Sequence, residues 1–109
     1  MERLDLLIQE IDKFNKDRDW DKFHTPDNLA KSISIEAAEL LECFQWSNKN
    51  YDLEAVKEEL ADIINYCLQM TMALDLDPIE IVKTKMKKTA EKYPIEKSRG
   101  VSTKYNKLI

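Results

Sequence analysis

Residues 53–74 read LEAVKEELADIINYCLQMTMAL. Apolar residues recur in this stretch at the three- and four-residue spacings of an α-helix, and they cover a broad arc of it. The members of this stripe are Leu53, Val56, Leu60, Ile63, Ile64, Cys67, Met70 and Leu74, widened by Leu68, Met72 and Ala73. A chain of 109 residues has little interior in which to bury so wide a face, so we expect part of it to pack against another copy of the chain.

Three more helices are predicted around this one. Thr25-Pro26 and Asp77-Pro78 each combine a capping residue with a proline suited to the first helical turn, and Asp52 is a cap for the long helix. The last 15 residues hold the single glycine and are predicted to be extended. The sequence therefore predicts an all-α protein, a four-helix bundle with an extended basic C-terminal tail, as one domain over residues 1–109. The predicted helices span residues 2–17, 25–46, 52–74 and 78–92.

Composition excludes several classes of protein. The chain is 43% hydrophobic and 35% charged, which is too apolar for a disordered chain. One glycine and three prolines are too few for a many-turned β-sandwich or for a glycine-rich phosphate loop. No apolar run is long enough for a membrane span, and the charged N-terminus is unlike a signal peptide. Cys43 and Cys67 lie in apolar helical patterns and are predicted to be buried free thiols, so we expect a soluble, cytoplasmic protein.

Charge is unevenly distributed along the chain. The net charge is −4, but residues 1–82 carry 8 basic and 19 acidic residues, whereas residues 83–107 carry nine basic and two acidic ones. The basic segment is either a solvated surface or an anion site. An acidic body with a basic tail suits a ligand that is itself a metal–polyphosphate. A nucleic acid partner is disfavoured because most of the surface would repel its phosphates.

Two pairs of acids lie at the margins of packing faces. On a helical wheel, Glu36 falls on the apolar seam of the second helix and Glu39 lies beside it, while Glu59 and Asp62 line one edge of the third. If the two helices pack antiparallel, the four carboxylates converge, and a cation must offset their repulsion. Oxygen ligands favour Mg²⁺ or Mn²⁺. Such pairs are also common on solvated helix faces. For each pair taken alone, the alternative to a metal site is therefore an ordinary solvated surface.

The stretches EAAELLE (36–42) and EELADIINY (58–66) look like the metal motif of the all-α nucleoside triphosphate pyrophosphohydrolases, the MazG-like proteins. In that motif, E-x-x-E is followed after a gap by E-x-x-D. The segments RDWDKFHTPDNLAKSISIEAAELLECFQW (18–46) and KYPIEKSRGVSTKY (92–105) further resemble the dCTP pyrophosphatase-like branch. The resemblance extends over about residues 18–107.

The resemblance implies Mg²⁺-dependent hydrolysis of a nucleoside triphosphate, dCTP or a modified relative, to the monophosphate and pyrophosphate, for control of nucleotide pools. It implies that the metal ligands are Glu36, Glu39, Glu59 and Asp62. As a mechanistic hypothesis of our own, Glu39 or Glu42 is the general base, and the sequence does not choose between them. The residues implied to surround the nucleotide are Trp20, His24, Trp46 and Tyr66, with Lys85, Lys88, Arg99 and Lys104 facing its phosphates. Thr89 stands where related sequences often have Asn, which leaves that polar contact open.

Other functions remain as alternatives. Phosphoribosyl-ATP pyrophosphohydrolases and dimeric dUTPases have similar acid-rich helical cores and other substrates. Two alternatives are not enzymes: a helical oligomerisation module, and a regulator that binds nucleotide without hydrolysing it. The oligomer is expected to be a homodimer or a homotetramer, with no nucleic acid or membrane partner.

Overall fold

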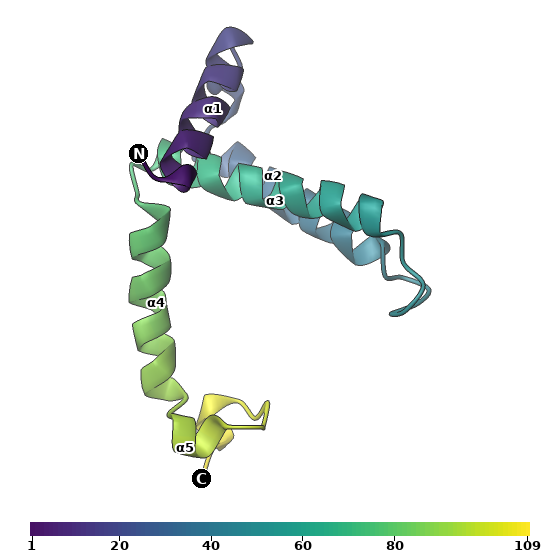
Figure 1. Ribbon diagram of the computed structural model, residues 1–109, viewed down its shortest axis with the longest axis vertical. Helices are drawn as coiled ribbons and strands as arrows, with labels where there is room; N and C mark the ends of the chain where they lie inside the picture. Colours follow the sequence, from purple (N-terminus) through teal and green to yellow (C-terminus); the bar gives the residue numbers. More distant parts are fainter. The chain divides into compact units, whose positions relative to one another are not determined.

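Helices make up all the regular secondary structure of the chain. The computed structural model describes residues 1–109, and it contains no strand, which confirms the all-α prediction. The chain forms two compact units, Met1–Asp75 and Leu76–Ile109 (Figure 1). The four-helix bundle and the single domain remain predictions. The first unit contains α1 (Arg3–Asp17), the short 3₁₀ turn η1 (Asp21–Phe23), α2 (Pro26–Glu42) and α3 (Leu53–Ala73); the second contains α4 (Pro78–Lys92), α5 (Ile95–Ser98) and η2 (Tyr105–Lys107).

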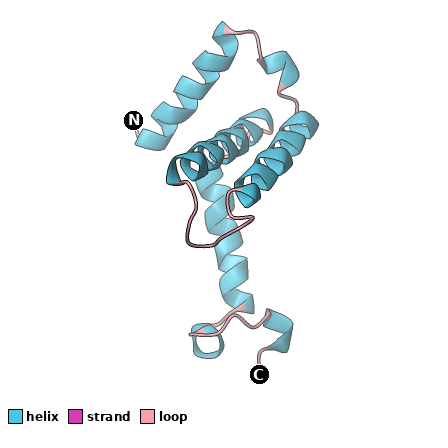
Figure 2. Ribbon diagram, turned by 90° about the vertical axis from the view of Figure 1, so that its right-hand side faces the viewer, coloured by secondary structure: helices cyan, strands magenta, loops and turns pink.

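In the first unit, α2 and α3 lie side by side and run antiparallel (Figures 1 and 2). Leu29 on α2 is 1% exposed and Leu68 on α3 is 7% exposed, so each helix contributes a side chain to the small core. Helix α1 packs more lightly, against α3, and buries Ile11. The antiparallel pair is what brings acids from two parts of the sequence together.

The predicted helix starts agree with the structure. The Asp52 carboxylate accepts hydrogen bonds from the N–H groups of Glu54 and Ala55, and Asp77 does the same for the turn that follows Pro78. Thr25 occupies the cap position of α2, but its hydroxyl donates to the Asp27 carboxylate and not to the helix backbone. Asp27 then lies in the first turn, where its charge suits the helix dipole.

The predicted extension of α2 to residue 46 is wrong. The helix ends at Glu42, and the N–H groups of Cys43, Phe44 and Gln45 bond to carbonyls three residues back, in tighter turns. The Phe44 ring lies 4.8 Å from the ring of Tyr51, across the loop to α3. This aromatic contact closes the loop in place of a further helical turn.

The prediction of an extended tail is also wrong. After α4, the chain forms the single turn α5, and Gly100 takes a left-handed φ of 76° that lets the chain turn back. The Tyr105 N–H then donates to the Tyr93 hydroxyl, 3.1 Å away, and the Lys92 ammonium lies 4.7 Å from the centre of the Tyr105 ring. The tail therefore folds onto the end of α4.

Much of the apolar surface of α3 is uncovered. Leu53, Leu60 and Ile64 are 58%, 45% and 49% exposed. Both cysteines are free thiols, but neither is buried as expected: Cys43 is half-buried, and Cys67 lies on this exposed part of α3. No helix is long and apolar enough to cross a membrane.

Candidate functional site

Three carboxylates meet between α2 and α3. Glu36, Glu59 and Asp62 each offer an oxygen, and these atoms lie within 4.8 Å of one another. Glu36 and Glu59 are half-buried, and one oxygen of each, Oε2, is shielded from solvent without a hydrogen-bond partner. Unpaired polar atoms of this kind are rare in folded proteins and call for an explanation.

The crowding of these acids changes their titration. The pKa of Glu36 is raised to about 7, first by the adjacent Glu59 carboxyl, which favours the protonated form, then by partial desolvation and by Glu39 and Asp62. The neighbouring Glu36 carboxyl lowers the pKa of Glu59, but Glu39, burial and Asp62 outweigh this, so the pKa of Glu59 also lies above its ordinary value. The metal-free cluster therefore repels itself near neutral pH.

The donor set fits a hard divalent cation. All three groups supply carboxylate oxygens, without the imidazole or thiolate ligands that zinc prefers. A cation placed among them would give the two buried oxygens a partner and offset the repulsion. The structure thus supports a metal site of this chemistry.

The other two predicted acids lie further out on α2. Glu39 is exposed, yet its charge raises the pKa of both Glu36 and Glu59, so it belongs to the rim of the cluster. Glu42 is exposed at the last position of α2. Of the two candidate general bases, only Glu39 contributes to the raised pKa values of the cluster.

A row of aromatic rings leads to the carboxylates. The rings of Phe14 and Trp20, Trp20 and His24, and His24 and Tyr66 meet edge to face with centroids 5.8, 6.3 and 6.4 Å apart. Burial raises the pKa of the Tyr66 hydroxyl, and the charges of Glu36 and Asp62 raise it further. Three residues predicted to surround a nucleotide therefore stand together beside the acids.

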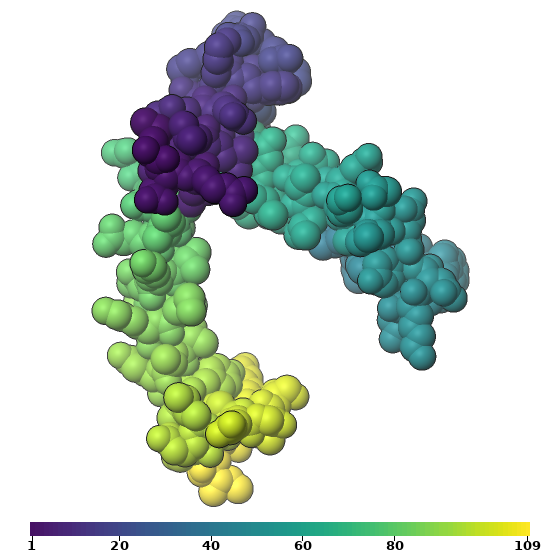
Figure 3. Space-filling model, viewed as in Figure 1, coloured from purple at the N-terminus to yellow at the C-terminus, as the bar shows by residue number.

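The remaining predicted residues lie elsewhere. Trp46 is 90% exposed in the loop between α2 and α3, which projects at the end of that helix pair away from α1 (Figure 3). Within the second unit, Lys85, Lys88, Arg99 and Lys104 are all exposed, the two lysines of α4 first and the others in the segment after it. The Thr89 hydroxyl donates to the carbonyl of Lys85 within α4.

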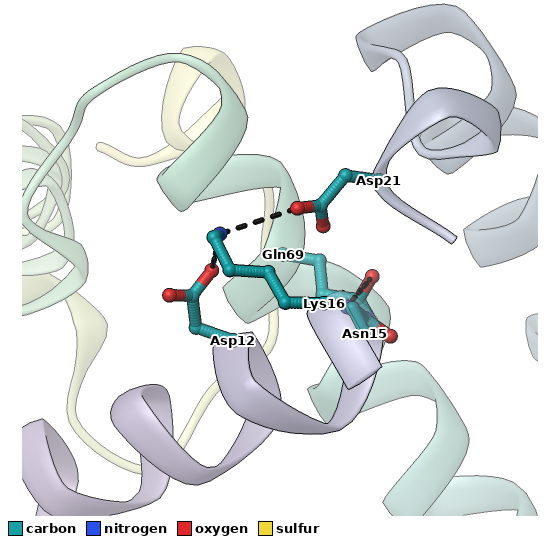
Figure 4. Close-up of polar contacts among 5 residues, drawn as sticks. All are labelled: Asp12, Asn15, Lys16, Asp21 and Gln69. Carbon is teal, nitrogen blue, oxygen red and sulfur yellow. Dashed lines mark hydrogen bonds and ion pairs between the residues drawn. The ribbon is translucent and has the colours of Figure 1, made fainter. Parts of the chain in front are cut away.

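Sequence reasoning missed a polar group beside this row. Asn15 on α1 and Gln69 on α3 are 4% and 6% exposed, and Figure 4 shows them meeting. Both line a cavity of about 240 Å³ together with His24. A signal was present, because Asn15 continues the apolar stripe of α1 four residues after Ile11. A polar residue at a core position of a helix signals a buried hydrogen bond.

Comparisons with known proteins agree with this geometry. The model of the MazG-like family matches residues 31–108. Two dCTP pyrophosphatases 1, from Mus musculus and Homo sapiens, are 32% and 31% identical over 105 residues, covering 88% of this chain. The chain spans 62% of the length of these relatives. A crystal structure of a pyrophosphatase from Archaeoglobus fulgidus DSM 4304 is 43% identical with a TM-score of 0.77, covering 86% of this chain and 94% of that one.

The family match includes both acid pairs and the basic segment, and it extends over well more than half of the chain. The solved relative has a similar fold over 86% of this chain. On these grounds, the chain belongs to the MazG-like family.

Proposed function

We propose that this chain is a Mg²⁺-dependent nucleoside triphosphate pyrophosphohydrolase, acting on dCTP or a modified relative of it. Water adds across the bond between the α and β phosphates, and the products are the nucleoside monophosphate and pyrophosphate. The single observation that carries the proposal is the convergence of three carboxylates with two buried, unpartnered oxygens. Membership of the MazG-like family and the dCTP pyrophosphatase relatives support the reaction and the substrate class.

The acids of α2 and α3 divide into two roles in this proposal. Glu36, Glu59 and Asp62 hold the cation, with Glu39 beside them. Mg²⁺, when bound there, supplies positive charge that offsets the triphosphate and polarises it. Glu39 orients a water and takes its proton, because it is the solvent-exposed acid whose charge reaches the cluster. Glu42, one turn further, is the alternative base.

The nucleoside is proposed to lie on the aromatic row. Trp20, His24 and Tyr66 offer ring surfaces and one hydroxyl beside the acids, and planar rings stack on bases. The basic residues Lys85 and Lys88 of α4, together with Arg99 and Lys104, are proposed to neutralise the phosphates. Trp46 is proposed to complete the base pocket from the loop that follows α2.

The active form is proposed to be a homodimer or homotetramer. Leu53, Leu60 and Ile64 expose apolar surface along α3, and a second copy would bury it. Sedimentation should then give a mass at least twice the 12.8 kDa of one chain. A sole species of 12.8 kDa at micromolar concentration would contradict this part of the proposal.

Pyrophosphate release from a panel of triphosphates tests the function. The panel holds canonical and modified deoxynucleotides, each assayed with Mg²⁺, with Mn²⁺ and with a chelator. We expect release that needs the metal and is fastest with a cytosine nucleotide. Preference for dUTP or for phosphoribosyl-ATP would keep the reaction and change the substrate.

Two substitutions make this assay specific for the proposed site. Glu59→Gln removes a metal-facing charge, whereas Glu58→Gln removes the neighbouring, exposed charge on the same helix. We expect activity to be lost in the first variant and kept in the second. Nucleotide binding without any pyrophosphate release would instead favour a regulatory module.

A further inference from the structure

Two buried amides join α1 to α3. The Asn15 Nδ2 donates to Gln69 Oε1 over 3.0 Å, and the Gln69 Nε2 donates to Asn65 Oδ1 over 2.9 Å, one turn earlier on α3. Figure 4 shows the Asn15–Gln69 contact where the last turn of α1 approaches α3. The first bond gives each of the two buried amides a partner, and losing it would leave the other amide unpaired, which costs more than the bond itself contributes.

The same asparagine sets the path of the chain toward Trp20. The main-chain carbonyl of Asn15 accepts hydrogen bonds from the N–H groups of Arg18 and Trp20, at 3.2 and 3.0 Å. Between them, Asp19 takes a left-handed φ of 54°, which aspartate tolerates, and the chain reverses there. The place of Trp20 therefore follows directly from the place of Asn15.

The helix that holds Gln69 also carries residues of the proposed active site. Tyr66 lies three residues before Gln69 on α3, and its ring meets that of His24, which in turn meets Trp20. Gln69 and His24 line the same cavity of about 240 Å³. One end of the amide contact thus fixes Trp20, and the other end is rigidly linked to Tyr66.

The other contacts of α1 with α3 and with η1 are less able to fix the position of α1. Ile11 is buried, but Leu7 and Phe14 of α1 remain 42% and 48% exposed, and apolar contact has no preferred direction. The Lys16 ammonium reaches Asp21 of η1 at 3.2 Å, but both side chains are solvated, and such pairs contribute little. The buried amides are the directional contact that remains.

We propose that Asn15 and Gln69 are positioning residues, which hold the Trp20–His24 pair against Tyr66 and thereby shape the surface that receives the nucleoside. The inference rests on the proposed function for its kinetic consequence. Neither amide touches the carboxylates in this proposal. Their loss should therefore weaken nucleotide binding and leave the metal site intact.

The test compares three variants. Gln69→Met removes both amide bonds and leaves the Asn15 amide buried without a partner. The double variant Asn15→Leu with Gln69→Met replaces both amides by apolar groups of similar size. This change restores stability but does not restore a directional hydrogen bond between α1 and α3. Lys13→Gln is the control, because it removes an exposed ion pair from the same part of α1 without touching η1.

Two readouts separate positioning from general stability. In pyrophosphate release, we expect KM to rise about tenfold in the single and double variants, with kcat changed much less. In a Trp46→Phe background, Trp20 is the only tryptophan, and we expect acrylamide to quench it more strongly in both variants. Lys13→Gln should match the parent in both measurements.

The outcomes decide between the two roles. A folded double variant with parental KM and parental Trp20 quenching would overturn the proposal, since the amides would then matter only for stability. If Gln69→Met does not fold, the double variant alone decides. If the parent releases no pyrophosphate, the proposed function fails. The difference in Trp20 quenching between the parent and the amide variants then tests the positioning role without any activity.

Discussion

Two groups of polar side chains share α3, and they differ in whether their hydrogen bonds are made. Near the middle of the helix, Glu59 and Asp62 face Glu36, and two carboxylate oxygens there are buried without a partner. Toward its end, Gln69 is bonded to both Asn15 and Asn65. Both groups join α3 to another helix of the first unit.

The difference separates binding from positioning. A satisfied buried network stabilises one arrangement of two helices and needs nothing from outside. An unsatisfied cluster of like charges costs stability until a ligand of opposite charge arrives. The five predictions below test this contrast from the largest expected effect to the smallest.

The largest effect is expected from Glu59→Gln. Losing a metal-facing carboxylate should lower pyrophosphate release by at least about a hundredfold, since metal charge stabilisation amounts to several kcal/mol. The fold should survive, because the change also relieves repulsion. Glu58→Gln is the matched control and should retain its rate. Equal rates in the two variants would remove the carboxylate cluster from the proposed reaction.

Mg²⁺ should stabilise the fold through the carboxylates. At a hundredfold excess over Kd, we expect the free energy of unfolding to rise by about 2.7 kcal/mol. Thermal unfolding with Mg²⁺ and with chelator measures this gain. The amide variant Gln69→Met should gain as much as the parent, whereas Glu36→Gln should gain less. A loss of the gain in Gln69→Met instead would show that the two groups are not independent.

Breaking the amide contact should cost stability that its apolar replacement restores. Gln69→Met leaves the Asn15 amide unpaired, so we expect the free energy of unfolding to fall by about 1–3 kcal/mol. The double variant with Asn15→Leu should recover most of that loss. Urea unfolding of both variants gives the two values. A double variant less stable than the single one would contradict the view that the loss in Gln69→Met comes from an unpaired Asn15 amide.

The metal-free protein should lose stability as pH rises from about 4.5 to about 7. Over that interval, folded Glu36 keeps a proton that the unfolded chain has already released, because its pKa is raised to about 7. The unfolding free energy therefore falls with pH and levels off above pH 7. Urea unfolding at several pH values measures the slope. Glu36→Gln should make the slope shallower, leaving the smaller contribution of Glu59, and a variant slope equal to the parental one would contradict an origin in Glu36.

The smallest effect is expected from Lys13→Gln. The Lys13–Asp17 pair joins side chains that are 78% and 55% exposed, so its loss should cost less than about 1 kcal/mol. Thermal or urea unfolding measures this change. A cost comparable to that of Gln69→Met would mean that the exposed ion pair stabilises α1 as much as the buried amide bond does.

Local signals in the sequence predicted most of the helices. Asp52 and Asp77 cap the helices that they were expected to cap, because capping depends on residues two or three positions away. The end of α2 and the fold of the tail were not predictable in this way. Each depends on an aromatic contact, Phe44 with Tyr51 and Tyr93 with Tyr105, between residues that local patterns treat as independent.

The helical wheel predicted which acids lie at the packing margins, and the structure brings Glu36, Glu59 and Asp62 together. It placed Glu39 nearer the seam than Glu42 but could not choose the general base, because that role depends on which acid reaches carboxylates on another helix. It indicated that part of the α3 stripe would stay uncovered within one chain, but not that Cys67 lies in that part, since this depends on what covers α3.

The sequence by itself determined the all-helical class, the helix starts and the two acid pairs, because spacing within one helix is a matter of 3.6 residues per turn. Only the tertiary structure decided that two carboxylate oxygens are left buried without a partner, while the Asn15 amide donates to that of Gln69. Those outcomes depend on how two helices approach, and residues 54 positions apart meet only after the chain has folded.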